Sequence, residues 1–150
     1  MKNITFADIE KEIKETNDSR CCTVVAGAVA FEKPFKEMQS LMRAEGRTFR
    51  KGLPLSACRR IYKKFADEFN FEYNEFYTES MTVSTAPRRL DPSKNYILFV
   101  RGHAVGMQKG RVIDWSEGRR HRVKQVIELT PRQATPETGR VTLAEFIKTL

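Results

Sequence analysis

Residues 96–115, YILFVRGHAVGMQKGRVIDW, carry the clearest structural signal in the chain. An apolar run at 96–100 precedes a second run at 103–107, and Gln108-Lys109-Gly110 separates that run from a third at 111–115. Short runs rich in Val, Ile, Phe and Tyr, joined by a turn that contains Gly, are typical of antiparallel strands. We therefore expect a hairpin here, in which residues whose numbers sum to about 219 face each other.

The pattern changes on moving outward from this region. Further strand signals lie at 71–77, 80–85 and 123–129, whereas the first half of the chain has helical patterns. Thr5 with Asp8 three residues later predicts the start of a helix over 5–15. The apolar run from Cys21 to Ala30 fits a buried strand or a buried helix by periodicity, and its small residues after Asn17-Asp18-Ser19 favour a tightly packed helix. Two more helices are expected, one from Pro34 to about Gly46 and one from Leu55 to about Phe69.

Helices first and antiparallel strands second predict an α+β fold. The chain has 150 residues, the size of one ordinary domain, and we expect a single domain over 1–150. A short amphipathic segment at 143–150 ends the chain.

Composition narrows the class of protein. No apolar run approaches the roughly 20 residues that span a bilayer, and the first residues form a charged segment rather than a signal peptide. We therefore expect no membrane association and a cytoplasmic location. Three cysteines without an export signal argue against a disulfide framework. A zinc site built from Cys22, Cys58, His103 and His121 stays open as an alternative, although its spacing is unlike that of common zinc sites.

The net charge of +8 points to acidic partners. A basic surface speeds association with acidic proteins and with nucleic acid, but it is also a simple means of staying in solution. The basic residues form small clusters along the chain: Arg59-Arg60, Lys63-Lys64, Arg88-Arg89 and Arg119-Arg120-His121-Arg122. The last of these is the best candidate for binding an acidic ligand, and a solvated loop is the alternative.

Cys22 is the first candidate for chemistry. It would lie in the first turn of its helix, where free backbone N–H groups stabilise an anion and favour the reactive thiolate. A cysteine in an apolar stretch is otherwise a core residue. Cys58, within a basic helix, fits that second description.

His103 and Asp114 change this assessment. The expected register brings Asp114 diagonally close to His103, where a carboxylate can hold the orientation of an imidazole. That imidazole could then deprotonate a thiol. A purely structural His–Asp hydrogen bond is the alternative. Trp115 is expected in the core beside this pair.

The order of an early helical Cys, a His on a hairpin and an Asp on the next strand resembles that of papain-like cysteine peptidases. The chain is most similar to small papain-like proteins of bacteriophages, over roughly residues 17–128. The matching stretches are Cys22 to Ala26, Gly46-Arg47, Lys51-Gly52, Gly102-His103, Gly110 and Asp114-Trp115.

The resemblance implies a papain-like fold and a cysteine hydrolase of peptidase or isopeptidase type. Cys22 would be the nucleophile, although Cys21 stays possible, and His103 the base that Asp114 orients. The family places an oxyanion-binding amide a few residues before the cysteine, which implies this role for Asn17; a helix-cap or turn role for Asn17 is the alternative. No metal or organic cofactor would be required.

A non-catalytic protein on the same fold is the second hypothesis. Such a phage-encoded effector would use its basic face to bind an acidic host protein or nucleic acid, in the host cytoplasm. A metal-dependent nucleic-acid enzyme ranks last, because the sequence has no carboxylate cluster suited to Mg²⁺.

Overall fold

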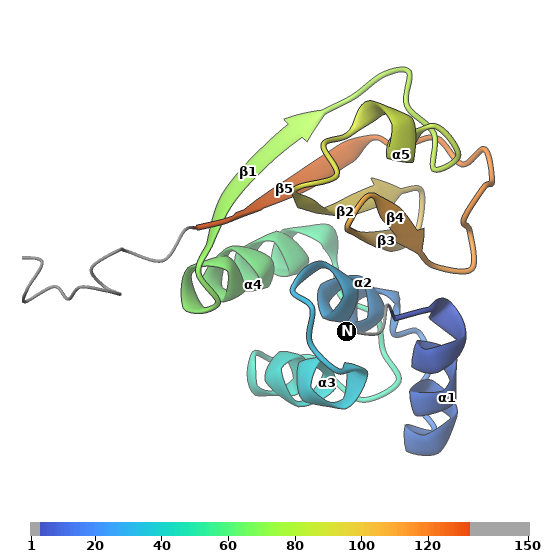
Figure 1. Cartoon of the computed structure of the whole chain (residues 1–150). Helices are drawn as coiled ribbons and strands as arrows, with labels where there is room; N and C mark the ends of the chain where they lie inside the picture. The colour runs from blue at the N-terminus through green and yellow to red at the C-terminus, as the bar shows by residue number, and fades with distance from the viewer. Residues whose placement is uncertain (1–3, 133–150) are drawn as a thin grey trace, which may run out of the picture.

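Helices occupy the first part of the chain and a five-stranded sheet the second (Figure 1). The computed structural model describes residues 4–132. Its elements in chain order are α1 (Phe6–Thr16), α2 (Cys22–Ala30), α3 (Phe35–Ala44), α4 (Leu55–Glu68), β1 (Phe71–Tyr77), the short α5 (Ala86–Arg89), β2 (Asn95–Val100), β3 (His103–Gln108), β4 (Arg111–Ile113) and β5 (Gln125–Pro131). The sheet is antiparallel with the order β1-β5-β2-β3-β4, so the predicted α+β class is confirmed.

Local signals explain the ends of the helices. The hydroxyl of Thr5 accepts from the backbone N–H of Asp8, whose carboxylate accepts from the backbone N–H of Thr5, which is the predicted capping box. Pro34 and Pro54 stand immediately before α3 and α4. Among residues 4–132, no helix is both long and apolar enough to cross a membrane.

Helix α2 lies between the sheet and the other helices (Figure 1). Its residues from Thr23 to Ala30 are all buried. A Cβ added to Gly27 would lie 3.2 Å from Met38 Sδ and 3.2 Å from Tyr62 Cε1, on the side of α3 and α4. A Cβ added to Gly106 of β3 would lie 2.9 Å from the carbonyl oxygen of Ala26. Only small residues allow α2 to approach both neighbours so closely.

Strand β2 separates two apolar clusters. Ile97 and Phe99 pack towards the helices, whereas Tyr96, Leu98 and Val100 pack on the opposite face of the sheet with residues of the segment before α5. The strand is therefore buried on both faces, which explains why its sequence is apolar throughout rather than alternating.

The hairpin register agrees with the prediction. Gly106 pairs with Ile113 and Gln108 with Arg111, so the paired residue numbers sum to 219. Lys109 and Gly110 have φ angles of 54° and 76°, the left-handed conformation that a tight two-residue hairpin turn requires. Strand β4 ends at Ile113, however, two residues earlier than expected, and Asp114 begins a turn.

Three other expectations need correction or fall outside the structure. Residues 80–85 do not form a strand: they contribute one isolated bridge, between Thr82 and Arg122, because the hydroxyls of Thr82 and Thr85 bond to each other's backbone N–H groups and close a turn. The last strand starts at Gln125 rather than at 123. The predicted segment at 143–150 lies outside the described residues.

Candidate active site

Cys22 is the first residue of α2 and is partly exposed. The preceding residue, Cys21, makes no side-chain bond to the first turn of the helix. The N–H groups of this turn have no partner within the helix and point past Cys22. The thiol therefore lies in the positive field of a helix N-terminus, as the sequence predicts.

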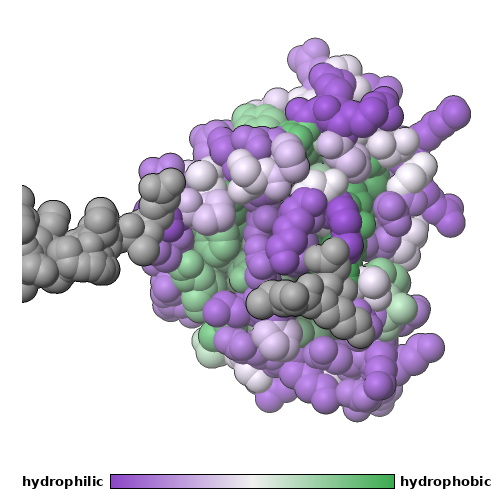
Figure 2. All heavy atoms as spheres, in the orientation of Figure 1, coloured by the Kyte–Doolittle hydropathy of each residue, from purple (hydrophilic) through white to green (hydrophobic). Residues whose placement is uncertain are grey.

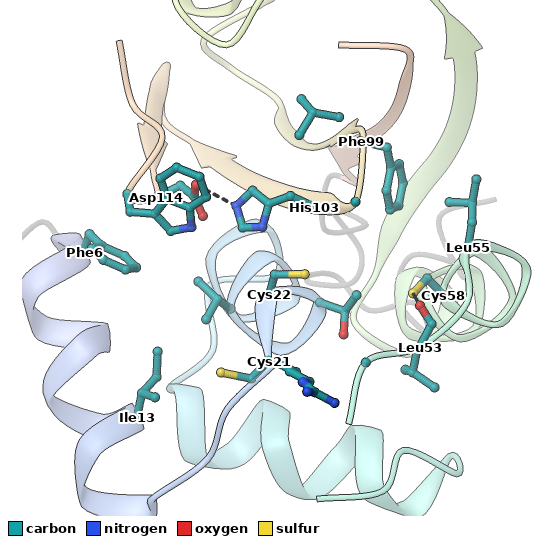
Figure 3. Close-up of a pocket in the computed structure, with 17 residues that line it drawn as sticks. Phe6, Ile13, Cys21, Cys22, Leu53, Leu55, Cys58, Phe99, His103 and Asp114 are labelled. Atoms are coloured by element: carbon teal, nitrogen blue, oxygen red, sulfur yellow. Dashed lines mark hydrogen bonds and ion pairs between the residues drawn. The ribbon is translucent and has the colours of Figure 1, made fainter. Parts of the chain in front are cut away.

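His103 begins β3 and faces both candidate partners (Figure 3). Its Nε2 lies 2.9 Å from Oδ2 of Asp114, which leaves Nδ1 as the nitrogen that can interact with the thiol of Cys22. The imidazole packs against the indole of Trp115, with 4.9 Å between ring centroids.

Asp114 is buried, and its Oδ2 has three hydrogen-bond partners. Besides His103, its Oδ2 accepts from the backbone N–H of Ser116 at 3.0 Å and from the Ser116 hydroxyl at 2.6 Å. Ser116 is completely buried. Sequence reasoning did not single out Ser116, although an Asp followed two residues later by Ser is a common turn pattern that could have indicated it.

The pKa values of Cys22 and His103 move in opposite directions. Burial disfavours the Cys22 thiolate, but the hydrogen bond from His103 and the backbone N–H of Ala104 outweigh burial and lower the pKa of Cys22. Burial also disfavours the imidazolium, but the bonds to Asp114 and Cys22 outweigh it and raise the pKa of His103 to about 9. Both shifts favour the thiolate–imidazolium pair over the neutral thiol and imidazole.

The other two cysteines differ from Cys22. Cys21 is buried, and burial together with the negative charge of Asp18 raises its pKa to about 11. Burial raises the pKa of Cys58 to about 12. Of the two adjacent cysteines, only Cys22 interacts with the imidazole, because the side chains of consecutive residues point in different directions.

Asn17 is not brought to this site. It is the C-terminal cap of α1, in the left-handed conformation with φ 58°, and its side chain is exposed. Its backbone N–H bonds to the carbonyl groups of Ile13 and Lys14. The capping alternative therefore describes Asn17, and the oxyanion role that the resemblance implied has no geometric support.

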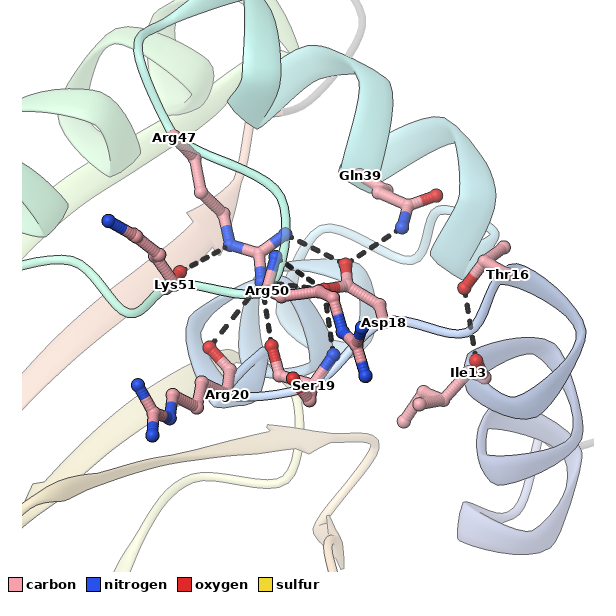
Figure 4. Close-up of polar contacts among 9 residues, drawn as sticks. All are labelled: Ile13, Thr16, Asp18, Ser19, Arg20, Gln39, Arg47, Arg50 and Lys51. Atoms are coloured by element: carbon pink, nitrogen blue, oxygen red, sulfur yellow. Dashed lines mark hydrogen bonds and ion pairs between the residues drawn. The ribbon is translucent and has the colours of Figure 1, made fainter.

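Asp18, the neighbour of Asn17, organises the loop before Cys22 (Figure 4). Its side chain and that of Arg47 are almost wholly buried, and the two form a bidentate pair at 2.8 and 3.1 Å. Arg47 also donates to the carbonyl oxygens of Ser19 and Lys51, at 3.1 and 3.0 Å. The pair thus joins the loop that precedes Cys22 to the loop 47–52.

A pocket of about 720 Å³ opens beside Cys22. It lies between α1, the N-terminus of α2, the start of α4 and the His103 end of the sheet (Figure 3). Its apolar walls include Phe6, Ile13, Leu53, Leu55, Phe99 and Trp115. The predicted core position of Trp115 is wrong: the side chain is 51 % exposed, because its strand ends before it and leaves the indole on the rim of the pocket.

The structure does not assemble the alternative zinc site. Among residues 4–132, no group of three or more His, Cys, Asp or Glu side chains could hold a metal ion. The ring of His121 instead packs edge-on against Trp115, with 5.7 Å between centroids.

Basic residues from two separate segments meet near this rim. The backbone N–H groups of Val83 and Ser84 bond to the carbonyl oxygens of His121 and Arg119, and Arg88 and Arg89 follow in α5. The face shown in Figure 2 is largely hydrophilic, over the α5 region at the top and over α1 and α3 below.

Comparisons with protein-family models, with curated proteins and with solved structures found no match to this chain.

Proposed function

We propose that this protein is a papain-like cysteine hydrolase that cleaves amide bonds through Cys22, His103 and Asp114. The observation that carries the proposal is the position of His103, which bonds to the buried carboxylate of Asp114 and interacts with the thiol of Cys22 strongly enough to lower the pKa of that thiol. A nucleophile hydrogen-bonded to a base, with that base oriented by a third group, is the arrangement that nucleophilic catalysis requires.

The reaction would proceed through an acyl-enzyme. The thiolate of Cys22 attacks the carbonyl carbon, and the backbone N–H groups at the start of α2 stabilise the oxyanion. The imidazolium of His103 then gives its proton to the departing amine as the carbon–nitrogen bond breaks. Water attacks the thioester while His103 takes one of its protons, and release of the acid restores the thiolate–imidazolium pair.

Asp114 and Ser116 would position His103 and would not contact the substrate. The carboxylate accepts from Nε2–H, which fixes the imidazole with Nδ1 towards the thiol. The two bonds from Ser116 hold the carboxylate itself in place. The papain-like relationship is supported by a helix-borne cysteine packed on an antiparallel sheet that presents the histidine and the aspartate.

Site-resolved alkylation tests the proposal. Wild type is treated with iodoacetamide across a range of pH, and modification of each of the three cysteines is measured by mass spectrometry. We expect Cys22 to react fast with an apparent pKa well below the ordinary cysteine value of about 8.5, and Cys21 and Cys58 to react slowly. His103→Ala should slow the alkylation of Cys22 by tenfold or more at neutral pH.

Cys58 serves as an internal control, because its reaction with iodoacetamide should be equal in wild type and in His103→Ala. Slow labelling of Cys22 that does not respond to the loss of His103 would refute the hydrolase proposal.

The exposed arginines favour a second candidate function. Arg88, Arg89, Arg119, Arg120 and Arg122 are all exposed, and the fold brings the two segments that carry them together. A non-catalytic, phage-encoded effector could bind an acidic host protein or nucleic acid through this face. Binding that weakens steeply with salt and is unaffected by Cys22→Ala, together with an unreactive Cys22, would favour this candidate.

A further inference from the structure

The wall of the pocket beside Cys22 is apolar and its rim is basic. Of the four large hydrophobic side chains that are exposed among residues 4–132, two line this pocket: Leu55 at 42 % and Trp115 at 51 %. Exposed apolar side chains that line a concave site cost free energy in the unbound protein, which they regain when a ligand covers them. The pocket is therefore suited to an apolar group.

The charges at the pocket are mainly positive. Among the lining residues, Asp114 is the one acid, and its charge is already engaged by His103. Arg20 also lines the pocket, and its side chain points away from the Asp18–Arg47 pair (Figure 4). The guanidinium of Arg119 lies over the Trp115 ring, 5.9 Å from its centroid. A ligand that enters here meets Arg20 in the lining and Arg119 beside Trp115, and among residues 4–132 neither arginine forms an ion pair.

We infer that the substrate is an acidic polypeptide segment that inserts one large aliphatic or aromatic side chain into this pocket. Acidic residues on either side of that side chain pair with Arg20 and Arg119, and the amide to be cleaved lies against Cys22. This inference rests on the proposed function for the position of that amide. The chemical character of the bound segment, apolar at its centre and acidic on both sides, is inferred from the apolar lining of the pocket and the arginines beside it.

The apolar wall favours a polypeptide over nucleic acid. A pocket of about 720 Å³ falls within the range of ordinary ligand sites and can hold a large side chain with part of its backbone. Nucleic-acid sites instead combine basic residues with base-stacking platforms that track an extended backbone. Ile13, Leu53 and Leu55 line this pocket together with its aromatic residues, and their aliphatic side chains offer bases no such platform.

Binding can be read without turnover, because Trp115 is the chain's single tryptophan and stands at the rim. The full-length Cys22→Ala protein is titrated with four matched peptides, which have Leu or Gly at the centre and Glu or Lys on both sides. Trp115 fluorescence reports the affinity. We expect the Glu-flanked Leu peptide to bind best, with a loss of tenfold or more when Leu becomes Gly and a comparable loss when Glu becomes Lys.

Two charge reversals in the protein test whether the Glu residues of the peptide bind at Arg20 and Arg119. Arg20→Glu and Arg119→Glu should each lower the affinity for the Glu-flanked Leu peptide several-fold. Each should also reduce the dependence of that affinity on salt. Arg60→Glu, an exposed reversal of the same size on α4 away from the pocket lining, should change the affinity little.

Equal affinity for the Leu and Gly peptides, or for the Glu and Lys peptides, would overturn the inference. So would tighter binding of a single-stranded DNA decamer than of every peptide. These results are independent of the alkylation test: peptide selectivity with an unreactive Cys22 would refute the hydrolase, whereas a reactive Cys22 without selectivity would refute the substrate class.

Discussion

His103 is the residue whose environment most affects the proposed chemistry. It receives opposing influences from burial and from two hydrogen-bonded partners, and the partners prevail. Because Asp114 is buried and held by Ser116, its carboxylate cannot turn away to solvent. These contacts favour the imidazolium in one orientation, which suits the proposed role of His103 as an acid towards a leaving amine.

The titration of His103 can be followed directly by NMR, since the chain has only two histidines. We expect the ring signals of His103 to titrate near pH 9, because its partners stabilise the imidazolium. Asp114→Asn should move that midpoint down by one unit or more, towards the ordinary value. His121, which is exposed, provides a reference signal in the same spectra. A midpoint of His103 near 6.5 in wild type would contradict the ion pair.

Thr23, next to Cys22, has a hydroxyl that is buried without a hydrogen-bond partner. Replacing it by the similarly shaped Val removes an unsatisfied polar atom. We expect Thr23→Val to raise the free energy of unfolding by about 1 kcal/mol, measured by urea denaturation. Thr23→Ser, which keeps the hydroxyl and loses a methyl group, should instead destabilise the protein. Equal destabilisation by both changes would show that the hydroxyl has a partner.

At the scale of elements, α2 connects the chemistry to the core. Its first residue is Cys22, the proposed nucleophile, and the rest of it is buried between β3 on one side and α3 and α4 on the other. Tyr62 of α4 donates its hydroxyl proton to the carbonyl oxygen of Thr23 at 2.5 Å. The position of Cys22 relative to His103 is thus set by how closely α2 approaches β3.

Gly106 tests this close approach. A Cβ at this position would lie 2.7 Å from Cβ of Val29 and 2.9 Å from a backbone oxygen, so α2 and β3 would have to separate. We expect Gly106→Ala to lower the free energy of unfolding by about 1–3 kcal/mol and to slow alkylation of Cys22. Gly52→Ala is the matched control, since nothing lies within 4 Å of its added Cβ and its φ is not in the left-handed region. An unchanged stability in Gly106→Ala would disprove the tight contact.

At the scale of the whole molecule, the Asp18–Arg47 pair joins segments distant in the chain. Asp18 also accepts from Gln39 of α3 and from the backbone N–H of Arg50, so one carboxylate fixes the approach to α2, the helix α3 and the loop before α4. A buried pair of this kind is costly to break, because the remaining charge loses its partner.

The stability of the protein at low pH depends on the carboxylate of Asp18. Burial disfavours the charged form of Asp18, but the bonds from Arg47, Gln39 and Ser19 outweigh it and lower the pKa of Asp18 from 3.8 to about 2. Its contribution to stability is therefore present above pH 3.8 and is lost as the pH falls through about 2. We expect Asp18→Asn to remove about 2–3 kcal/mol from the free energy of unfolding at neutral pH and to flatten its dependence on pH in this window.

Arg47→Met removes the cation of the same pair. It leaves Asp18 buried without its cation, so we expect a loss of about 3–5 kcal/mol in urea denaturation. If both single variants unfold like wild type at neutral pH, the pair does not hold the loops together.

The amino-acid sequence determined the local features of this protein. The capping box at Thr5, the tight turn at Lys109-Gly110 and the hairpin register follow from neighbouring residues alone, because caps and turns depend on short-range backbone geometry. The register in turn indicated that His103 and Asp114 would meet. The pairing of Cys22 with His103 was a hypothesis from chain order and resemblance, since no local pattern fixes a contact across that many residues.

The tertiary structure decided what depends on packing between distant segments. It placed Asn17 in a cap, buried Asp18 with Arg47, brought Ser116 to Asp114 and left Trp115 on the rim of the pocket. It also ended β4 at Ile113, which frees Asp114 to turn towards His103. Side-chain burial and the pKa shifts that follow from it depend on which segments meet, and no local pattern in a single sequence specifies that.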